Sequence, residues 1–220
     1  MTENNELFEI KDYGYAERLI PSSAKNAELI GEKHKQIVYC SCRLFFAKGY
    51  HPTSIRDIAT ACGMSMGQLY HYISSKDDVL FLVHLHLHNI YYQYMTKFRL
   101  EHIKDPVRRL TKALYHTLHF IVENTELVMF LYTESKYLKK RHLRLILEMD
   151  GRNLVGFWYR LLEGANRKKA IKLDTEFAAN LIAYLMVFLS LRKWNLKERP
   201  IEAYFDLMVD FILRGLGIVE

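Results

Sequence analysis

The sequence predicts an all-α fold, and three observations support this prediction. The 220 residues include only 10 Gly and 4 Pro, too few for the many turns that a β-rich chain of this length needs. Apolar residues recur at the three- and four-residue spacing of a helix face. Pairs of polar residues three positions apart, which suit helix starts, precede several of these stretches. Half of the residues are hydrophobic, enough for a globular core.

The N-terminal part of the chain divides into an arm and a first helix. Residues 1–31 show weak periodicity and mixed charge, and we expect a frayed or partly helical arm. The first regular helix is predicted over residues 32–48, where Ile37, Leu44 and their neighbours recur at helical spacing. Gly49 follows, and glycine readily adopts the left-handed conformation that ends a helix.

The next thirty or so residues contain three successive capping boxes, in which two side chains satisfy the free N–H groups of a helix start. The pairs are Ser54 with Asp57, Ser65 with Gln68, and Ser75 with Asp78. Helices are therefore predicted to begin near residues 55, 66 and 76. Gly63 permits a sharp turn between the first two, which makes the pair a helix-turn-helix.

The remainder of the chain is predicted to be long helices. They cover about 76–101, 106–123, 125–137, 140–166, 174–196 and 200–215. The apolar stretch at residues 177–191 contains two polar residues and is shorter than the roughly 18 residues of a membrane span. The acidic N-terminus has no signal pattern. We therefore expect a cytoplasmic protein with no membrane partner.

Charge alone does not identify a partner. The net charge is +6, but residues 1–96 carry 9 Lys and Arg against 10 Asp and Glu, and the basic excess lies in residues 97–220. A basic surface often binds nucleic acid. Because the excess lies outside the predicted helix-turn-helix, DNA binding has to be argued from the motif.

In a helix-turn-helix, the second helix lies in the major groove of DNA, with its N-terminal residues at the base edges. Here that helix is short and begins with small residues, Gln68 can read a base edge, and Thr53 and Lys76 are placed to meet phosphates. The predicted DNA-binding residues are Thr53, Ser54, Ser65, Met66, Gly67, Gln68, Tyr70, His71 and Lys76. The predicted small core beneath them is Ile55, Ile58, Ala59, Leu69 and Tyr72.

Residues 37–80 resemble the DNA-binding domain of the TetR family at fixed spacing over about a fifth of the chain. The matching residues are Ile37, Leu44, Phe45, Gly49, Tyr50, Thr53, Ser54, Ile55, Asp57, Ile58, Ala59, Gly63, Gly67, Leu69, Tyr70, His71, Tyr72 and Lys76. The sequence departs from the family at Cys40 and Cys42, where alanines are usual, and at Ile73, where Phe is commoner.

The resemblance implies a homodimeric repressor of about nine helices that leaves double-stranded operator DNA when a small molecule binds. It implies a helix-turn-helix domain over 32–80 and an effector-binding and dimerisation domain over 81–220. The last two long helices are expected to form a four-helix bundle between the two subunits.

The effector is expected to be anionic with an apolar part, as in an acyl-coenzyme A (acyl-CoA). Clusters of Lys and Arg suit phosphates, although a solvated basic face is the plainer interpretation, and Met and aromatic residues suit a greasy channel. The layout of residues 132–197 is similar to TetR-family regulators of fatty-acid degradation (FadR-type). The predicted effector-binding residues are Arg109, Met129, Phe130, Met149, Asn153, Phe157, Trp158, Tyr184 and Phe188.

Two other functions are alternatives to a ligand-responsive repressor. One is a TetR-like DNA-binding protein with no small-molecule effector, whose C-terminal domain binds another protein. The other is an enzyme, which we do not expect, because the sequence has no phosphate loop, nucleophile elbow or zinc-protease motif.

We also expect no metal site and no cofactor. Cys40, Cys42 and Cys62 lack the spacing of zinc ligands and are predicted to be reduced core residues. His84 and His88 share a helix face but have no third ligand at a defined spacing.

Overall fold

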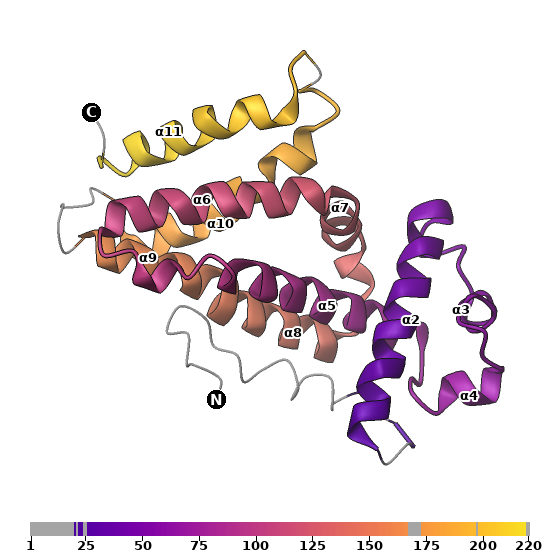
Figure 1. Cartoon of the computed structure of the whole chain (residues 1–220). Coiled ribbons are helices and arrows are strands. Elements are labelled where there is room, and N and C mark those ends of the chain that lie inside the picture. Colours follow the sequence, from indigo (N-terminus) through magenta and orange to yellow (C-terminus); the bar gives the residue numbers. More distant parts are fainter. Residues whose placement is uncertain (1–19, 21, 24–25, 167–172, 197, 219–220) are drawn as a thin grey trace. The chain divides into compact units, whose positions relative to one another are not determined.

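The structure is a computed structural model, and it describes residues 20, 22–23, 26–166, 173–196 and 198–218 (Figure 1). All regular structure in these residues is helical, which confirms the predicted fold class. The described residues form nine helices if the uninterrupted run from α8 through a π-helical turn to α9 is taken as one. Most of the predicted arm lies outside the described residues.

The α-helical segments keep the labels of Figure 1. They are α2 (Ala27–Lys48), α3 (Ile55–Ala61), α4 (Met66–Tyr70), α5 (Lys76–Thr96), α6 (Pro106–Glu123), α7 (Thr125–Glu134), α8 (Lys140–Met149), α9 (Gly156–Asn166), α10 (Thr175–Arg192) and α11 (Phe205–Gly215). The shorter elements are the 3-10 turns Leu100–His102, Ser135–Tyr137 and Ile201–Tyr204, and the π-helical turn Asp150–Val155.

Capping residues set most of the helix boundaries. The helices predicted to begin near 55, 66, 76 and 106 begin at those residues. The first helix begins earlier than predicted, at Ala27, because the side chain of Asn26 accepts from the backbone N–H groups of Glu28 and Leu29. Helix α5 ends earlier than predicted, at Thr96, and Arg99 beyond it has a φ of 45°.

The described chain falls into two compact units. The N-terminal unit comprises residues 20–90 and 129–148, and the C-terminal unit comprises 91–128 and 149–218. Helix α5 contributes residues to both. The boundaries of these compact units differ from those of the predicted functional domains, 32–80 and 81–220. The compact units reflect contacts between residues, whereas the predicted domains follow the sequence motif.

The core of the N-terminal unit lies where α2 packs on α3, beside α4 (Figure 1). Ile37, Ile58, Leu69 and Ile73 have no exposed surface. Tyr72 was predicted in this core but is only half-buried, as is Ile55. Ile73 takes the buried position instead, one residue along the chain after α4 has ended.

The C-terminal unit is built around α6, which contacts α9, α10 and α11. The buried face of α6 carries Leu110, Leu114 and Leu118, each without exposed surface, and α9 contributes Phe157 and Trp158. By length and composition alone α10 could cross a membrane, a test that the core helix of a globular protein also passes. Its contacts with α6 and α9 bury one side of it.

Candidate functional site

Helix α4 presents its polar and small residues to the surface. Ser65, Gly67, Gln68 and Tyr70 are exposed, whereas Leu69 is fully buried and anchors the helix. Ser65 Oγ accepts from the backbone N–H of Gln68, and Gln68 Oε1 accepts from the N–H of Ser65. The predicted capping box is confirmed, and the exposed residues include the first turn of α4, as a helix that enters a DNA groove requires.

Helix α3 and the turn after it are held in place by a second capping box. The carboxylate of Asp57 accepts from the N–H of Ser54 and, at 2.6 Å, from Nζ of Lys48. The hydrogen bond from Lys48 is the largest cause that lowers the pKa of Asp57 to about 2, so this carboxylate is ionised at neutral pH. Gly63 has a φ of +65°, which confirms the sharp turn between α3 and α4.

Thr53 does not have the role predicted for it. Its side chain has no exposed surface, and its hydroxyl donates to the backbone oxygen of Gly49 at 2.7 Å. A buried hydroxyl that already donates its proton is not placed to bind a phosphate. Thr53 instead closes the turn between α2 and α3.

Lys76 also has a structural role that the sequence did not reveal. Its ammonium donates to the backbone oxygens of Tyr50, His51 and Thr53 at 3.0–3.2 Å and lies 4.2 Å from the centre of the Tyr50 ring. An ammonium has three protons, and these carbonyls account for all of them. Lys76 therefore ties the loop before α3 to the start of α5, which corrects its assignment as a phosphate contact.

The C-terminal end of α4 meets the segment before α2. Ser23 Oγ lies 2.6 Å from Nδ1 of His71, and the hydroxyl of Ser22 donates to the backbone oxygen of His71. His71 remains exposed. Residues 22–23 thus hold the end of α4, a contact that the sequence pattern did not indicate.

The C-terminal unit buries two polar side chains without partners among the described residues. Asn153 lies in the π-helical turn Asp150–Val155 and is 4% exposed, yet neither its Oδ1 nor its Nδ2 has a hydrogen-bond partner. The Nε1 of Trp158, five residues on, is buried and unpartnered as well. Each such group costs about 1–3 kcal/mol, and π-helical turns occur often at functional sites.

Aromatic rings connect this buried pair to the half-buried His116 in the middle of α6. In this ring series, neighbouring ring centres lie 3.4 to 6.5 Å apart. In order, its members are Trp158, Phe157, Tyr91, Phe120, Tyr94, Phe98 and His116. The hydroxyl of Tyr91 also bonds to that of Thr117 at 2.8 Å, which fixes α5 to α6 inside the C-terminal unit.

Residues 40–83, which include α3, α4 and the turn between them, match the family model described as bacterial regulatory proteins, tetR family. Over this segment, about a fifth of the chain, the protein is similar to the TetR family of transcriptional regulators. Its helix-turn-helix is therefore a DNA-binding domain.

A named relative agrees with this assignment. The chain is 29% identical over 132 residues to the HTH-type transcriptional regulator HbdR of Aromatoleum sp. (strain CIB), an alignment that covers 60% of this chain. The aligned segment spans 56% of that relative's length, little more than half of it.

Solved structures of other proteins share the fold. AibR in complex with isovaleryl coenzyme A and operator DNA superposes with a TM-score of 0.67 at 23% identity, over 81% of this chain and 96% of that one. The transcriptional regulator FadR from Bacillus subtilis in complex with stearoyl-CoA gives 0.69 at 16% identity, over 82% and 98%. At these identities the likeness concerns the fold.

The residues predicted to bind the small-molecule effector lie in both compact units. Met149, Asn153, Phe157 and Trp158 are buried together along the run from the end of α8 into α9. Phe130 belongs to the N-terminal unit, where it stacks on Phe45 at 5.1 Å.

The other predicted effector residues have different surroundings. Met129 is half-buried in the N-terminal unit. Arg109 is half-buried and donates to the backbone oxygen of Ile103. Tyr184 and Phe188 are 54% and 37% exposed on α10, on the outside of the C-terminal unit.

One buried cluster in this TetR-type protein was not predicted. Asp77, Asp78 and His142 bring three possible metal ligands within 4.8 Å of one another. Both carboxylates already accept hydrogen bonds, Asp77 from His142 Nδ1 and the Lys139 N–H, and Asp78 from the N–H groups of Ser74 and Ser75 just before α5. The cluster is thus a capping network that ties α8 to α5, and no sequence spacing could reveal it.

Proposed function

We propose that the protein is a homodimeric, cytoplasmic repressor that leaves its operator when an acyl-CoA binds in the C-terminal unit. The observation that carries this proposal is the unpartnered pair Asn153 and Trp158 in the core of that unit. A core evolved for stability alone satisfies its buried polar groups. A core that receives a ligand leaves donors and acceptors for it.

The DNA-binding part of the proposal rests on α4. With the helix in the major groove, Gln68 is the residue best suited to read a base, because its Oε1 is used in the capping box and its Nε2 can donate to a base edge. Ser54, Ser65, Met66, Gly67, Tyr70 and His71 remain the other proposed DNA contacts. All six are exposed or half-buried around α3 and α4.

Dimerisation is supported by apolar faces that nothing in the described chain covers. On α10, Phe177 and Tyr184 are 60% and 54% exposed, and on α11, Leu207 and Phe211 are 56% and 67% exposed. The residues on each helix share one face by their spacing. A second copy of the chain is the occupant that we propose, because two such helices from each subunit form a four-helix bundle with an apolar centre.

The anionic, apolar character of the ligand is supported by the chain and by its structural neighbours. The C-terminal half holds the basic excess of the sequence, and the ring series offers an apolar wall next to the unpartnered amide of Asn153. Two solved proteins of the same fold hold isovaleryl coenzyme A and stearoyl-CoA. An acyl-CoA combines the phosphates and the apolar chain that these features suit.

Release from DNA is proposed to act through α5. This helix contributes residues 76–90 to the N-terminal unit and 91–96 to the C-terminal unit, where Tyr91 is bonded to Thr117. Two heads of a dimer reach successive major grooves only when they are about 34–36 Å apart. A ligand that displaces the C-terminal part of α5 changes this spacing, and it shifts the equilibrium only if it binds the two states unequally.

The experiment is an operator selection followed by binding assays. DNA selected from a random library by the purified protein would be titrated by fluorescence anisotropy with and without acyl-CoAs of graded chain length. Loss of affinity with one range of chain lengths supports the proposal. If the affinity for operator DNA is the same with and without every acyl-CoA, the proposal of an acyl-CoA effector is overturned. DNA binding then stands, and a protein partner for the C-terminal unit is favoured.

A further inference from the structure

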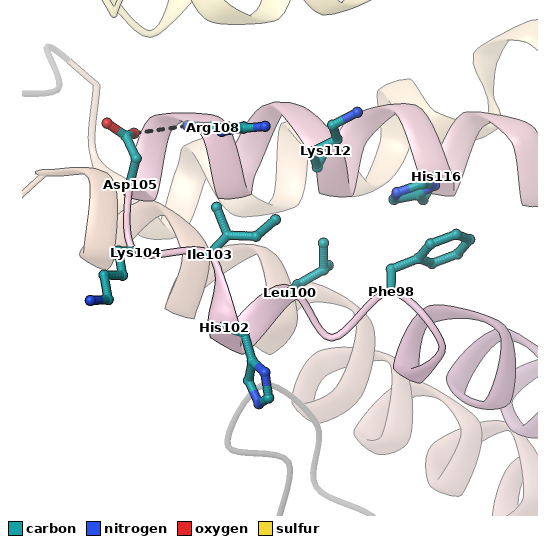
Figure 2. A pocket seen from close by; sticks show the side chains of 9 residues that line it. All are labelled: Phe98, Leu100, His102, Ile103, Lys104, Asp105, Arg108, Lys112 and His116. Atoms are coloured by element: carbon teal, nitrogen blue, oxygen red, sulfur yellow. Dashed lines mark hydrogen bonds between the residues drawn. The ribbon is translucent and has the colours of Figure 1, made fainter.

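A pocket of about 460 Å³ opens beside the start of α6, within the C-terminal unit. Arg108, Lys112 and His116 line it from α6 at four-residue spacing, which places them on one face of the helix. Figure 2 shows Phe98, Leu100 and Ile103 across from them, on the segment that leads into α6, while His102 points the other way. The pocket thus has a basic wall opposite an apolar floor.

The positive charge in this pocket is not compensated by ion pairs. Neither Arg108 nor Lys112 pairs with an acidic side chain among the described residues. The one acidic residue of the lining, Asp105, is the N-cap of α6 and accepts from the N–H groups of Val107 and Arg108. Burial, and after it the charge of Lys112, lower the pKa of His116. An anion that entered would therefore find unpaired cations in a partly dry site.

One end of the pocket is formed by two flat rings, those of Phe98 and His116. The ring of His116 stacks on that of Phe98, with ring centres 3.4 Å apart and planes inclined by 12°. These two rings are also the outer end of the ring series, whose other end is Trp158 beside Asn153. Ring contacts inside one unit therefore link the lining of the pocket to the core proposed to receive the effector.

We infer that this pocket holds the phosphorylated nucleotide end of the effector, with Arg108 and Lys112 on its phosphates and the apolar floor beneath its ribose and base. The inference rests on the proposed acyl-CoA response and assigns the nucleotide end of that ligand, opposite its acyl chain. The volume of the pocket falls in the range of small-molecule sites. A fatty acid without the nucleotide would use the ring series but not this pocket.

The test compares ligands that share one end only. Isothermal titration would use adenosine 3′,5′-bisphosphate, a long-chain acyl-CoA, the matching free fatty acid and inorganic phosphate. The test variants are Arg108→Gln and Lys112→Gln. The control is Arg199→Gln, which removes another exposed arginine of the same unit that does not line the pocket. Circular dichroism melts would confirm that all variants fold.

We expect Arg108→Gln and Lys112→Gln to weaken the bisphosphate and the acyl-CoA on the order of 10- to 100-fold each, as for loss of a hydrogen bond to a charged group. The fatty acid should be unaffected, and Arg199→Gln should match the wild type. If inorganic phosphate binds as tightly as the bisphosphate, the nucleotide assignment is overturned.

The outcomes also separate this inference from the proposed function. If both pocket variants bind the acyl-CoA as the wild type does, the assignment of the pocket to the nucleotide is overturned and the proposed acyl-CoA response stands. If no acyl-CoA binds, but the bisphosphate binds and Arg108→Gln weakens it, the assignment of the pocket stands and the acyl-CoA response is overturned. If the wild type binds none of the four, both are overturned.

Discussion

His142 of α8 donates from its Nδ1 to Oδ2 of Asp77 of α5 over 2.5 Å, and both side chains are buried. Phe81 stacks against the imidazole, with ring centres 4.3 Å apart. The other oxygen of Asp77 accepts from the backbone N–H of Lys139 at 2.6 Å. One carboxylate therefore ties the first turn of α5, which follows the helix-turn-helix, to the start of α8 within the N-terminal unit.

Replacement of His142 by alanine should destabilise the protein by about 3 kcal/mol, because it leaves the buried carboxylate of Asp77 without its partner. Urea unfolding followed by circular dichroism measures the loss. His102→Ala, which removes an exposed histidine, is the control and should change stability little. A His142→Ala protein as stable as the control would show that the pair contributes nothing.

Stability should also fall with acid in a way that depends on Asp77. Burial raises its pKa, but the bonds from His142 and Lys139 outweigh this and hold the pKa below the usual 3.8. Such a group stabilises the fold above the unfolded pKa, and the contribution is lost as the pH falls through the folded pKa. The unfolding midpoint of the wild type should drop between about pH 5 and pH 2, more than that of Asp77→Asn. The exposed Asp210→Asn is the control, and parallel curves for all three proteins would contradict the assignment.

Substitutions of Gln68 should separate its capping role from base reading. Gln68→Glu keeps an oxygen that can accept from the Ser65 N–H but removes the amide donor. Discrimination at one base pair should relax by about 1–3 kcal/mol, while the melting temperature stays near that of the wild type. Gln68→Ala should lose both the discrimination and part of the stability. Unchanged base preference in both variants, measured on a panel of operator mutants, would remove Gln68 from the interface.

The proposed dimer face can be tested with one charge. Leu207→Asp and Phe211→Asp place a carboxylate on the exposed apolar side of α11 and should shift the mass in sedimentation from twice 26.1 kDa toward 26.1 kDa. Leu147→Asp, at a leucine 60% exposed on α8, serves as the matched control and should leave the mass unchanged. Full-size dimers of the Leu207 and Phe211 variants would place the interface elsewhere.

Asn153→Leu should stabilise the ligand-free protein and abolish its response. A leucine of similar volume removes two unsatisfied polar atoms, so the free energy of unfolding should rise by about 1–3 kcal/mol. An acyl-CoA should no longer release the variant from operator DNA. The exposed Asn195→Leu controls for the added apolar surface. A destabilised Asn153→Leu protein would mean that the amide has a structural partner in solution.

The fold could be predicted because helix capping depends on residues that are close in the sequence. Ser54, Ser65 and Asp105 cap helix starts through side chains that bond within three residues, and each start was predicted correctly. The roles of Thr53 and Lys76 were not predictable in this way, because exposure and bonding depend on how a loop folds back onto distant backbone. Motif matching gives the residue type but not the direction of its side chain.

The candidate ligand site was only partly predictable for the same reason. Asn153 and Trp158 were singled out from the sequence, but nothing in it showed that Asn153 lies in a π-helical turn or that both side chains are buried without partners among the described residues. The four-residue spacing of Arg108, Lys112 and His116 was visible. The segment that sets Phe98 opposite them contains Arg99 at positive φ, and no turn residue marks that bend.

The π-helical turn at residues 150–155 has a consequence for how this chain tolerates change in length. A π-helical turn accommodates one residue more than the α-helical path between the same ends. Deletion of a single residue there should convert the turn to regular α-helix, whereas the same deletion inside an ordinary helix would shift every residue that follows to another face. Such a shortened protein should keep its helix-turn-helix and bind its operator, but the proposed effector should no longer release it.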